Sequence, residues 1–366
     1  MSTSAALSTA VTRMFGVDYP IFGFTHSVDV CVAVCEAGGI GIYGGTRETP
    51  EEISVHLAEI RRRVGSRPFG VDLVLPNGMP ERNNREEIEQ AIPPGHRDFV
   101  DGIYGKYGVR RDGGSGTRSR FVRSQETAAR QIEVVLASTV DIFACGIGSP
   151  LEAIREAQSL GKKIVSLVGT PKQARRVKDA GVDLIVAQGY DAGAHTGQIG
   201  TFSLVPQVVD VAGDTPVVAA GGVVSGRHLA AALALGAQGV WVGTAWLVTK
   251  ENHTDPIILQ KLLAAGPEDT VISRADSGKT LRQVRSAWSE EWATAGAPIP
   301  LKMPYQDILI GDLLGAVERQ KVETLMHSPA GQGIGTLNEE TTVAETMARL
   351  VREAEAALGP RPVGVR

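Results

Sequence analysis

Eight short apolar runs, each followed by a segment with helical periodicity, recur between residues 20 and 247 of the chain. Within these runs apolar residues do not alternate with polar ones, as expected for strands that are covered on both faces. Strands that alternate with helices form parallel sheets, and eight such units predict a closed (β/α)8 barrel, the TIM-barrel fold. The predicted strands are Pro20–Phe24, Ile40–Gly45, Phe69–Leu75, Asp141–Gly148, Lys163–Gly169, Asp183–Gly189, Pro216–Gly222 and Gly239–Leu247.

A doubly wound open sheet is the main structural alternative, because it is also built from alternating strands and helices. Two observations favour the barrel. No predicted strand runs into the Gly-x-Gly-x-x-Gly turn of a dinucleotide-binding fold, and glycines stand at the carboxyl ends of nearly all eight strands. That edge is where a (β/α)8 barrel places its active site.

The predicted barrel spans residues 11–250 and is interrupted by a long insertion at 76–120, between the third and fourth strands. The insertion contains the glycine-rich run Gly113–Gly116 and shows helical periodicity only around Glu86–Ala91. A connection of this length is uncommon in a compact domain unless it has a function. We therefore expect a partly mobile flap.

Two further segments follow the eighth strand. Residues 255–329 show helical patterns at Ile257–Ala265 and Val284–Trp292, which predict a small helical lid or substrate domain. Residues 330–366 contain an amphipathic pattern over Thr341–Leu358, and this helix is expected to return to the barrel wall.

The charge balance favours a small-molecule partner. The formal net charge is −4 and no basic run is present, whereas nucleic-acid and anionic-membrane partners usually require clustered Lys and Arg. We therefore expect neither of those partners.

Cysteine usage and the N-terminal residues indicate a cytoplasmic protein. The three cysteines, Cys31, Cys35 and Cys145, are too few for a disulfide framework, and the first two are interpreted as core residues rather than metal ligands. No metal site is expected. The chain shows neither a signal-peptide pattern nor about 18 uninterrupted apolar residues.

The ends of the seventh and eighth strands predict a phosphate-binding site. Gly221 and Gly222 follow the seventh strand, and Gly243-Thr244 lies in the eighth. Barrels commonly hold a phosphate there on backbone N–H groups, which glycines leave uncovered. The alternative is that these glycines only permit tight turns.

His195 is the main catalytic candidate. It lies just past the sixth strand among Gly189, Gly193 and Gly197, and its imidazole can exchange a proton near neutral pH. His26, just past the first strand, is an open case, and the other histidines are interpreted as structural.

Polar side chains of neighbouring strands reach the same edge. They are Asp72 on the third strand, Thr170 after the fifth and Gln188 on the sixth. An inward amide or carboxylate at this edge could form a hydrogen bond with a heterocycle, although an unpaired buried carboxylate is costly.

These motifs resemble those of the nitronate monooxygenases, formerly called 2-nitropropane dioxygenases. The resemblance covers most of residues 11–250. It rests on Asp18–Gly23, Glu36–Gly45, Ala187–Gly197, Leu204–Asp210 and Pro216–Leu247, with Ser277-Gly278-Lys279, Arg282, Glu290–Trp292 and Ala330–Gln332 resembling the family's C-terminal portion.

The resemblance implies an FMN-dependent barrel enzyme that oxidises alkyl nitronates or nitroalkanes with O2 to carbonyl compounds and nitrite. His195 would face the flavin ring, where it would act as a base or hold the nitronate oxygen. The implied flavin contacts are Gly23, Phe24, Thr25, Asp72, Gln188, Gly193, Gly222, Gly243 and Thr244.

The chain departs from the family pattern at two positions. Asp72 stands where the family usually has Asn, which puts the hydrogen bond to the flavin edge in doubt. Ala194 stands where a Gly usually precedes the histidine. We expect the turn to tolerate Ala194 with a negative φ.

Two other functions agree with the same motifs. FMN-dependent NAD(P)H reductases of the enoyl-acyl-carrier-protein or quinone type share the fold and the flavin, but they take electrons from a pyridine nucleotide. A barrel that binds a phosphorylated ligand without turnover is a third reading, although it leaves His195 unexplained. The oligomeric state stays open, with a homodimer as one option.

Overall fold

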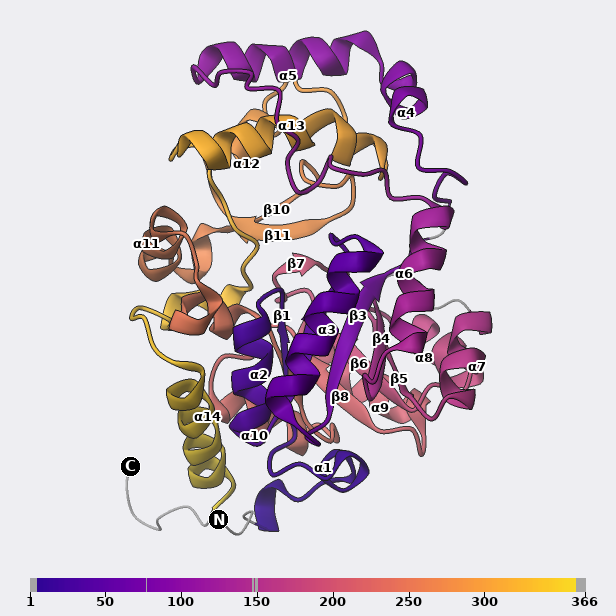
Figure 1. Cartoon of the computed structure of the whole chain (residues 1–366). Helices are drawn as coiled ribbons and strands as arrows, with labels where there is room; N and C mark the ends of the chain where they lie inside the picture. The colour runs from indigo at the N-terminus through magenta and orange to yellow at the C-terminus, as the bar shows by residue number, and fades with distance from the viewer. Residues whose placement is uncertain (1–4, 77, 147, 149–150, 360–366) are drawn as a thin grey trace.

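The eight predicted strands form one closed parallel barrel in the order β1-β2-β3-β4-β5-β6-β8-β9, so the (β/α)8 fold is confirmed (Figure 1). The structure is a computed structural model, and it describes residues 5–76, 78–146, 148 and 151–359. The barrel strands are β1 (Ile21–Thr25), β2 (Ile40–Gly44), β3 (Phe69–Val74), β4 (Ile142–Gly146), β5 (Lys163–Val168), β6 (Leu184–Gln188), β8 (Val217–Ala220) and β9 (Val240–Val242).

The absence of alternation in the sequence reflects two apolar faces. Side chains such as Phe22, Ile42 and Val186 belong to a cluster inside the barrel, whereas Ile21 and Tyr43 pack outward against the helices. Because both faces of each strand are buried, an in/out pattern of hydrophobicity cannot develop.

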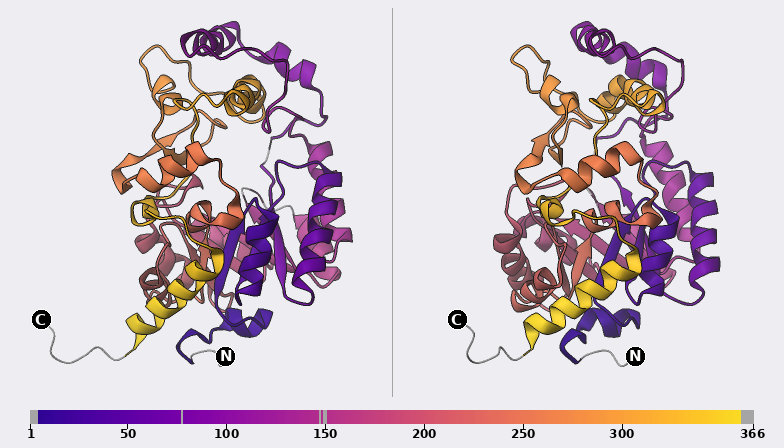
Figure 2. Two further views of the ribbon diagram at one scale, coloured as in Figure 1. Left: turned by 60° about the vertical axis from the view of Figure 1, so that its left-hand side comes forward. Right: turned by 90° about the vertical axis from the view of Figure 1, so that its left-hand side faces the viewer.

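The helices surround the barrel, and the C-terminal helix closes the ring beside α10 (Figure 2). The expected return of Thr341–Leu358 to the barrel wall is seen as α14, although residues 360–366 of that predicted segment lie outside the described residues. The surrounding helices are α2 (Val28–Glu36), α3 (Pro50–Val64), α6 (Gln125–Ala137), α7 (Leu151–Ser159), α8 (Pro171–Asp179), α9 (Thr201–Ala212), α10 (Gly226–Ala234) and α14 (Val343–Leu358), and α1 (Ala10–Phe15) precedes β1.

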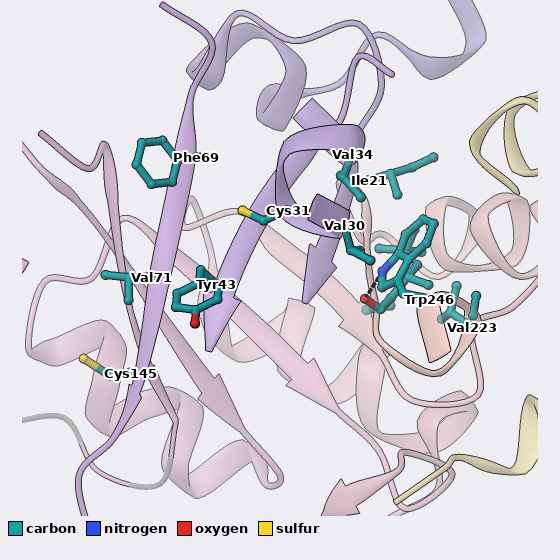
Figure 3. Packing of buried hydrophobic residues seen from close by; sticks show 14 of the residues in the cluster. Ile21, Val30, Cys31, Val34, Tyr43, Phe69, Val71, Cys145, Val223 and Trp246 are labelled. Atoms are coloured by element: carbon teal, nitrogen blue, oxygen red, sulfur yellow. Dashed lines mark hydrogen bonds between the residues drawn. The ribbon is translucent and has the colours of Figure 1, made fainter. Parts of the chain in front are cut away.

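Close packing between β1 and α2 depends on a glycine. A Cβ atom at Gly23 would lie 2.7 Å from a methyl group of Val34, and the Trp246 indole occupies the same region (Figure 3). The Trp246 ring N–H donates a hydrogen bond to the carbonyl oxygen of Val242 at 2.7 Å, so its one polar atom is satisfied. Cys31, on α2, is buried in the same cluster.

The insertion and the segment after β9 form one cap above the mouth of the barrel (Figures 1 and 2). Val100 and Ile103 of the insertion share a hydrophobic cluster with Trp292, Ile310 and Leu313. The cap elements are α4 (Arg85–Ala91), α5 (Pro94–Lys106), β10 (Thr270–Ser273), β11 (Leu281–Val284), α12 (Ala287–Glu291) and α13 (Tyr305–Gln320), with α11 (Pro256–Ala264) connecting β9 to them. Short 3-10 turns lie at Ala5–Leu7, Thr244–Val248, Lys250–Asn252, Pro267–Asp269 and Gln332–Thr336.

The region predicted as a purely helical lid also contains a β-hairpin. β10 and β11 pair in antiparallel fashion, and β11 also pairs with β7 (Ala194–His195). The helical interpretation of Val284–Trp292 was therefore wrong at its start, because Val284 ends a strand and the helix begins at Ala287. His195 of the partner strand β7 lies 86 residues earlier in the chain than Leu281, so local periodicity could not reveal the pairing.

Among the described helices, none combines the length and the apolar character needed to cross a bilayer.

Candidate active site

The floor of the barrel mouth is built from inward-facing residues at the carboxyl ends of the strands. Asp72 pairs in register with Gly44 on β2 and with Ala144 on β4, while Gln188 pairs with Ala220 on β8. Three of these five residues carry no side chain or only a methyl group. The absence of a side chain at Gly44 makes room for the His26 imidazole, which would lie 2.6 Å from a Cβ atom there.

Beside this floor, two successive glycines turn the backbone after β8. Gly221 and Gly222 have φ angles of 101° and 73°, which L-residues rarely adopt. Next to them, a Cβ atom on Gly243 would meet nothing closer than the Phe24 carbonyl oxygen, at 4.0 Å. The open space at Gly243, beside the turn at Gly221 and Gly222, is compatible with a phosphate held by backbone N–H groups, and we call these three residues the glycine cradle. The start of α10 at Gly226 is not part of this cradle, because the Gly226 N–H donates a hydrogen bond to the Glu353 carboxylate at 2.8 Å.

His195 is held in place from three directions. Its backbone belongs to β7, where it pairs with Leu281 of β11. Its carbonyl oxygen accepts a hydrogen bond from the Gln188 amide nitrogen at 2.6 Å, and its Nε2 atom lies 2.6 Å from the Ser277 hydroxyl oxygen. His195 is therefore held both by its main chain and by its imidazole ring.

Ser277 was not predicted as a site residue. It lies 82 positions after His195, in the β10–β11 connection, and only its place in the Ser-Gly-Lys motif singled it out in the sequence. The hairpin brings it to the imidazole, and no local pattern could show this contact.

Burial and positive charge both act on His195. Desolvation lowers the pKa of the imidazole to about 4, and the nearby cations Arg118, Arg47, Arg123 and Lys279 contribute in the same direction. At neutral pH the imidazole is therefore uncharged, with one nitrogen that can donate a proton and one that can accept.

The cations around the mouth are only partly neutralised. Arg47 pairs with Asp307 at 3.0 Å, and Arg118 pairs with Asp276 at 2.8 Å. Arg123 is buried and donates a hydrogen bond to the Val74 carbonyl oxygen at 2.6 Å.

In the part of the chain that the structure describes, neither Arg123 nor Lys279 forms an ion pair with a carboxylate. The pKa of Lys279 is lowered by burial and by Arg123, so the two cations are close enough to repel each other. The mouth carries an excess of positive charge, which favours an anionic ligand.

A cavity of about 440 Å³ is lined by residues of the cap and by Arg47 of the loop after β2. Arg118, Asp276 and His327 line its polar side, and Leu314 and Met326 contribute an apolar side. Apart from Arg47, its walls come from the insertion and from the segment after β9, so this space belongs to the cap rather than to the floor of the mouth.

Four predicted cofactor residues have other partners in the structure. Gly23 faces α2, and a Cβ atom on Gly193 would collide with the backbone of Ala330 at 2.7 Å. The Thr25 hydroxyl accepts a hydrogen bond from the Ser27 N–H, and the Thr170 hydroxyl caps α8. Their placement explains their small or polar character through packing and capping.

The other predicted residues lie at the mouth itself. Phe24 faces inward and stacks on Trp241, with ring centroids 5.9 Å apart. The Thr244 hydroxyl accepts a hydrogen bond from the Gly331 N–H, which ties the C-terminal segment to the cradle. His26, the open case, lies 2.8 Å through Nδ1 from the Gly44 carbonyl oxygen, and burial lowers its pKa.

The expected negative φ at Ala194 was wrong. Ala194 has a φ of 59°, in the left-handed region that glycine adopts more easily. The turn after β6 must reverse so that Ala194 and His195 can pair with Arg282 and Leu281, and this tertiary requirement outweighs the local preference.

The chain is similar to known proteins over almost its whole length. A family model described as nitronate monooxygenase matches residues 6–353. A protein of Mycobacterium tuberculosis with a provisional monooxygenase name is 37% identical over 364 residues, covering 95% of this chain and 96% of its own length. A Bacillus subtilis protein named probable nitronate monooxygenase is 28% identical, covering 92% of this chain and 95% of its own length.

Among solved structures, the nitroalkane oxidase from Streptomyces ansochromogenes is similar to this chain, with a TM-score of 0.79 and 27% identity over 95% of this chain and 99% of its own. FabK from Thermotoga maritima has a TM-score of 0.73 and 26% identity, covering 96% of this chain and 97% of its own.

Proposed function

Because the chain belongs to the nitronate monooxygenase family and is thus an oxidoreductase, we propose that it is an FMN-dependent enzyme that oxidises alkyl nitronates or nitroalkanes with O2 to carbonyl compounds and nitrite. One observation carries the proposal. An anchored imidazole that is uncharged at neutral pH lies among cations at the barrel mouth, at the same edge of the barrel as the glycine cradle, where Gly243 leaves space for a ligand.

The residues at the mouth fit FMN. The backbone at Gly221, Gly222 and Gly243 would hold the phosphate, and the floor around Asp72 and Gln188 would receive the ring. An unpartnered buried oxygen of Asp72 supports this assignment, because such an atom is costly unless a ligand satisfies it. FMN, when bound, supplies the electron acceptor for the oxidation.

His195 and the unpaired cations Arg123 and Lys279 would have different roles toward the substrate. The positive charge of Arg123 and Lys279 would attract the anionic nitronate and favour it over the neutral nitroalkane. On a neutral nitroalkane, the lone pair of the His195 imidazole would remove the C–H proton, with Ser277 orienting the ring. A base with a pKa of about 4 is weak, so we expect the preformed nitronate to be the better substrate.

The purified protein provides the first test of this function. We expect a yellow protein whose flavin is bleached by ethyl nitronate under anaerobic conditions, and which forms nitrite when O2 is admitted. Bleaching by NADPH alone, without reaction toward ethyl nitronate, would reject the oxygenase and support the NAD(P)H-dependent reductase, with which the similarity to FabK is also consistent. A colourless protein that cannot be reconstituted with FMN would reject both.

The variant His195→Asn tests the role of the imidazole. General-base catalysis contributes roughly 10²–10⁴-fold, so kcat/KM for neutral nitroethane should fall by that factor while FMN stays bound. The loss should be smaller for ethyl nitronate, which needs no proton removal. His253→Asn is the matched control, because His253 lies at the surface with φ 50°, a conformation that Asn tolerates. Unchanged nitrite formation from nitroethane in His195→Asn would remove the imidazole from the mechanism.

A further inference from the structure

Asp72 is a buried acid on the floor of the barrel mouth. Its relative exposure is 4%, and its Oδ1 atom has no hydrogen-bond partner. It occupies an inward position of β3, between Gly44 and Ala144 in register. The His26 imidazole fills the space over Gly44, whereas Ala144 places only a methyl group beside the carboxyl group. An inward, buried carboxyl oxygen without a partner is costly unless a ligand satisfies it.

The position of Asp72 relative to the glycine cradle suits the ring of a bound flavin. β3 lies on the opposite side of the closed barrel from β8, four strands away in the ring. A nucleotide whose phosphate is held after β8 and β9 would extend its flavin ring across the mouth toward β3. The carboxyl group would then meet an edge of that ring.

Among the residues that the structure describes, no cation forms an ion pair with Asp72. The titratable groups next to it in the described part of the chain are the Cys145 thiol on β4 and the His26 imidazole over Gly44. Burial raises the pKa of the Asp72 carboxyl to about 7, and a hydrogen bond from the Gly146 backbone opposes this only in part. The uncharged acid is therefore accessible at physiological pH.

A neutral carboxylic acid matches the pyrimidine edge of a flavin better than a carboxylate does. That edge presents an N–H donor between two carbonyl oxygens. A protonated acid offers one O–H donor and one carbonyl acceptor, as an amide does, whereas a carboxylate only accepts and would repel the flavin oxygens. The two protonation states thus predict different binding.

We propose that Asp72 binds the pyrimidine edge of FMN in its protonated form, donating its O–H to a flavin carbonyl oxygen and accepting the flavin N–H, so that flavin binding and proton binding are coupled. The inference rests on the proposed FMN function and goes beyond it, because it makes cofactor retention depend on pH. FMN would be held tightly below neutral pH and released more readily above it.

The coupling is tested by FMN release from the holoenzyme, followed by flavin fluorescence after dilution between pH 6 and pH 9. We expect the wild-type Kd to rise by up to about tenfold per pH unit above the pKa of Asp72. The variant Asp72→Asn presents the same donor and acceptor without titrating, and its Kd should change only as far as ionisation of the FMN phosphate requires. Riboflavin lacks the phosphate, so its Kd for the wild-type protein should rise with pH only through the ionisation of Asp72.

A second measurement uses the wild-type protein alone. Calorimetric titration of apoprotein with FMN at pH 8, in buffers of different ionisation enthalpy, should show an uptake of close to one proton on binding. Equal pH slopes in wild type and Asp72→Asn, or binding without proton uptake, would overturn this inference while leaving the FMN function intact. A protein that binds no flavin at any pH would overturn both.

Discussion

Ala194 precedes His195 with a φ of 59°, so a residue with a Cβ atom adopts the left-handed conformation at the centre of the candidate site. That conformation costs an L-residue roughly 1–2 kcal/mol relative to glycine. The pairing of β7 with β11 holds the strained residue in place, and the same pairing positions the His195 ring beside Ser277. The backbone strain at Ala194 and the position of the His195 ring therefore have one cause, the pairing of β7 with β11.

The substitution Ala194→Gly should therefore stabilise the protein. Relief of the left-handed strain is partly offset by the greater flexibility of glycine in the unfolded chain, leaving a net gain of about 0.5–1 kcal/mol. The measurement is the free energy of unfolding from urea titration. Ala231→Gly, the same change inside α10 at an exposed position, is the control and should lose about 1 kcal/mol. A destabilisation of similar size in both variants would contradict the strain argument.

At the scale of elements, helix α13 carries a groove of small residues that receives the insertion. A Cβ atom on Gly311 would lie 2.5 Å from the Ser119 Cβ atom, and one on Gly315 would lie 2.5 Å from the Cα atom of Gly116. The two glycines stand one helical turn apart, on the same face of α13. The glycine-rich run Gly113–Gly116, part of the insertion expected to form a partly mobile flap, thus includes a residue that packs tightly against a helix.

Replacing Gly311 by Ala should loosen this contact. The added methyl group must displace the backbone near Ser119, and overpacking of this kind typically costs about 1–3 kcal/mol. We expect a lower Tm and faster cleavage of the insertion in limited proteolysis. Gly102→Ala in α5 is the matched control, since a Cβ atom there meets nothing within 4 Å and should add about 0.5–1 kcal/mol of helix stability. Equal Tm values for the two variants would mean that the groove is not tightly packed.

At the scale of the whole molecule, a buried ion network joins the cap to the barrel. Arg47 comes from the loop after β2, Arg118 from the insertion, Asp276 from the hairpin connection and Asp307 from α13. Asp276 also lies 3.2 Å from the His327 ring nitrogen and accepts the Trp288 indole N–H at 2.8 Å. Burial would raise the pKa of the Asp276 carboxyl, but His327 and Arg118 together hold it well below its usual range.

This network should contribute to stability above pH 4 and weaken in acid. A carboxyl with a lowered folded-state pKa stabilises the protein fully above its unfolded-state value of about 3.9, and the contribution disappears as the pH falls toward the folded-state pKa. The variant Asp276→Asn should lose about 3–5 kcal/mol at pH 7, because Arg118 loses its shortest carboxylate contact, and its stability should depend less on pH between 4 and 2. Unfolding titrations across pH 2–7 provide the measurement. An unaltered acid slope would show that Asp276 is not the titrating group.

The barrel could be predicted from the sequence because each of its strands and helices leaves a pattern within a short stretch of the chain. Each apolar run is as long as one strand, and the helical periodicity between runs sets the order β-α-β. Chain direction then requires the strand ends, and with them Asp72, Gln188 and Gly222, to gather at one edge. His195 and the glycines after β8 were identified on the same principle, and their roles toward a flavin remain predictions.

Only the tertiary structure decided which distant residues complete the site. Ser277 reaches His195, Arg118 reaches Asp276, and Ala194 takes a positive φ because the hairpin of the cap pairs with the turn after β6. Periodicity records which face of an element is apolar, but it carries no information about how loops separated by 82 or 158 residues dock. The sequence by itself therefore determined the barrel and the edge where chemistry is expected, whereas packing of the cap on that edge determined the charge and the partners of the imidazole.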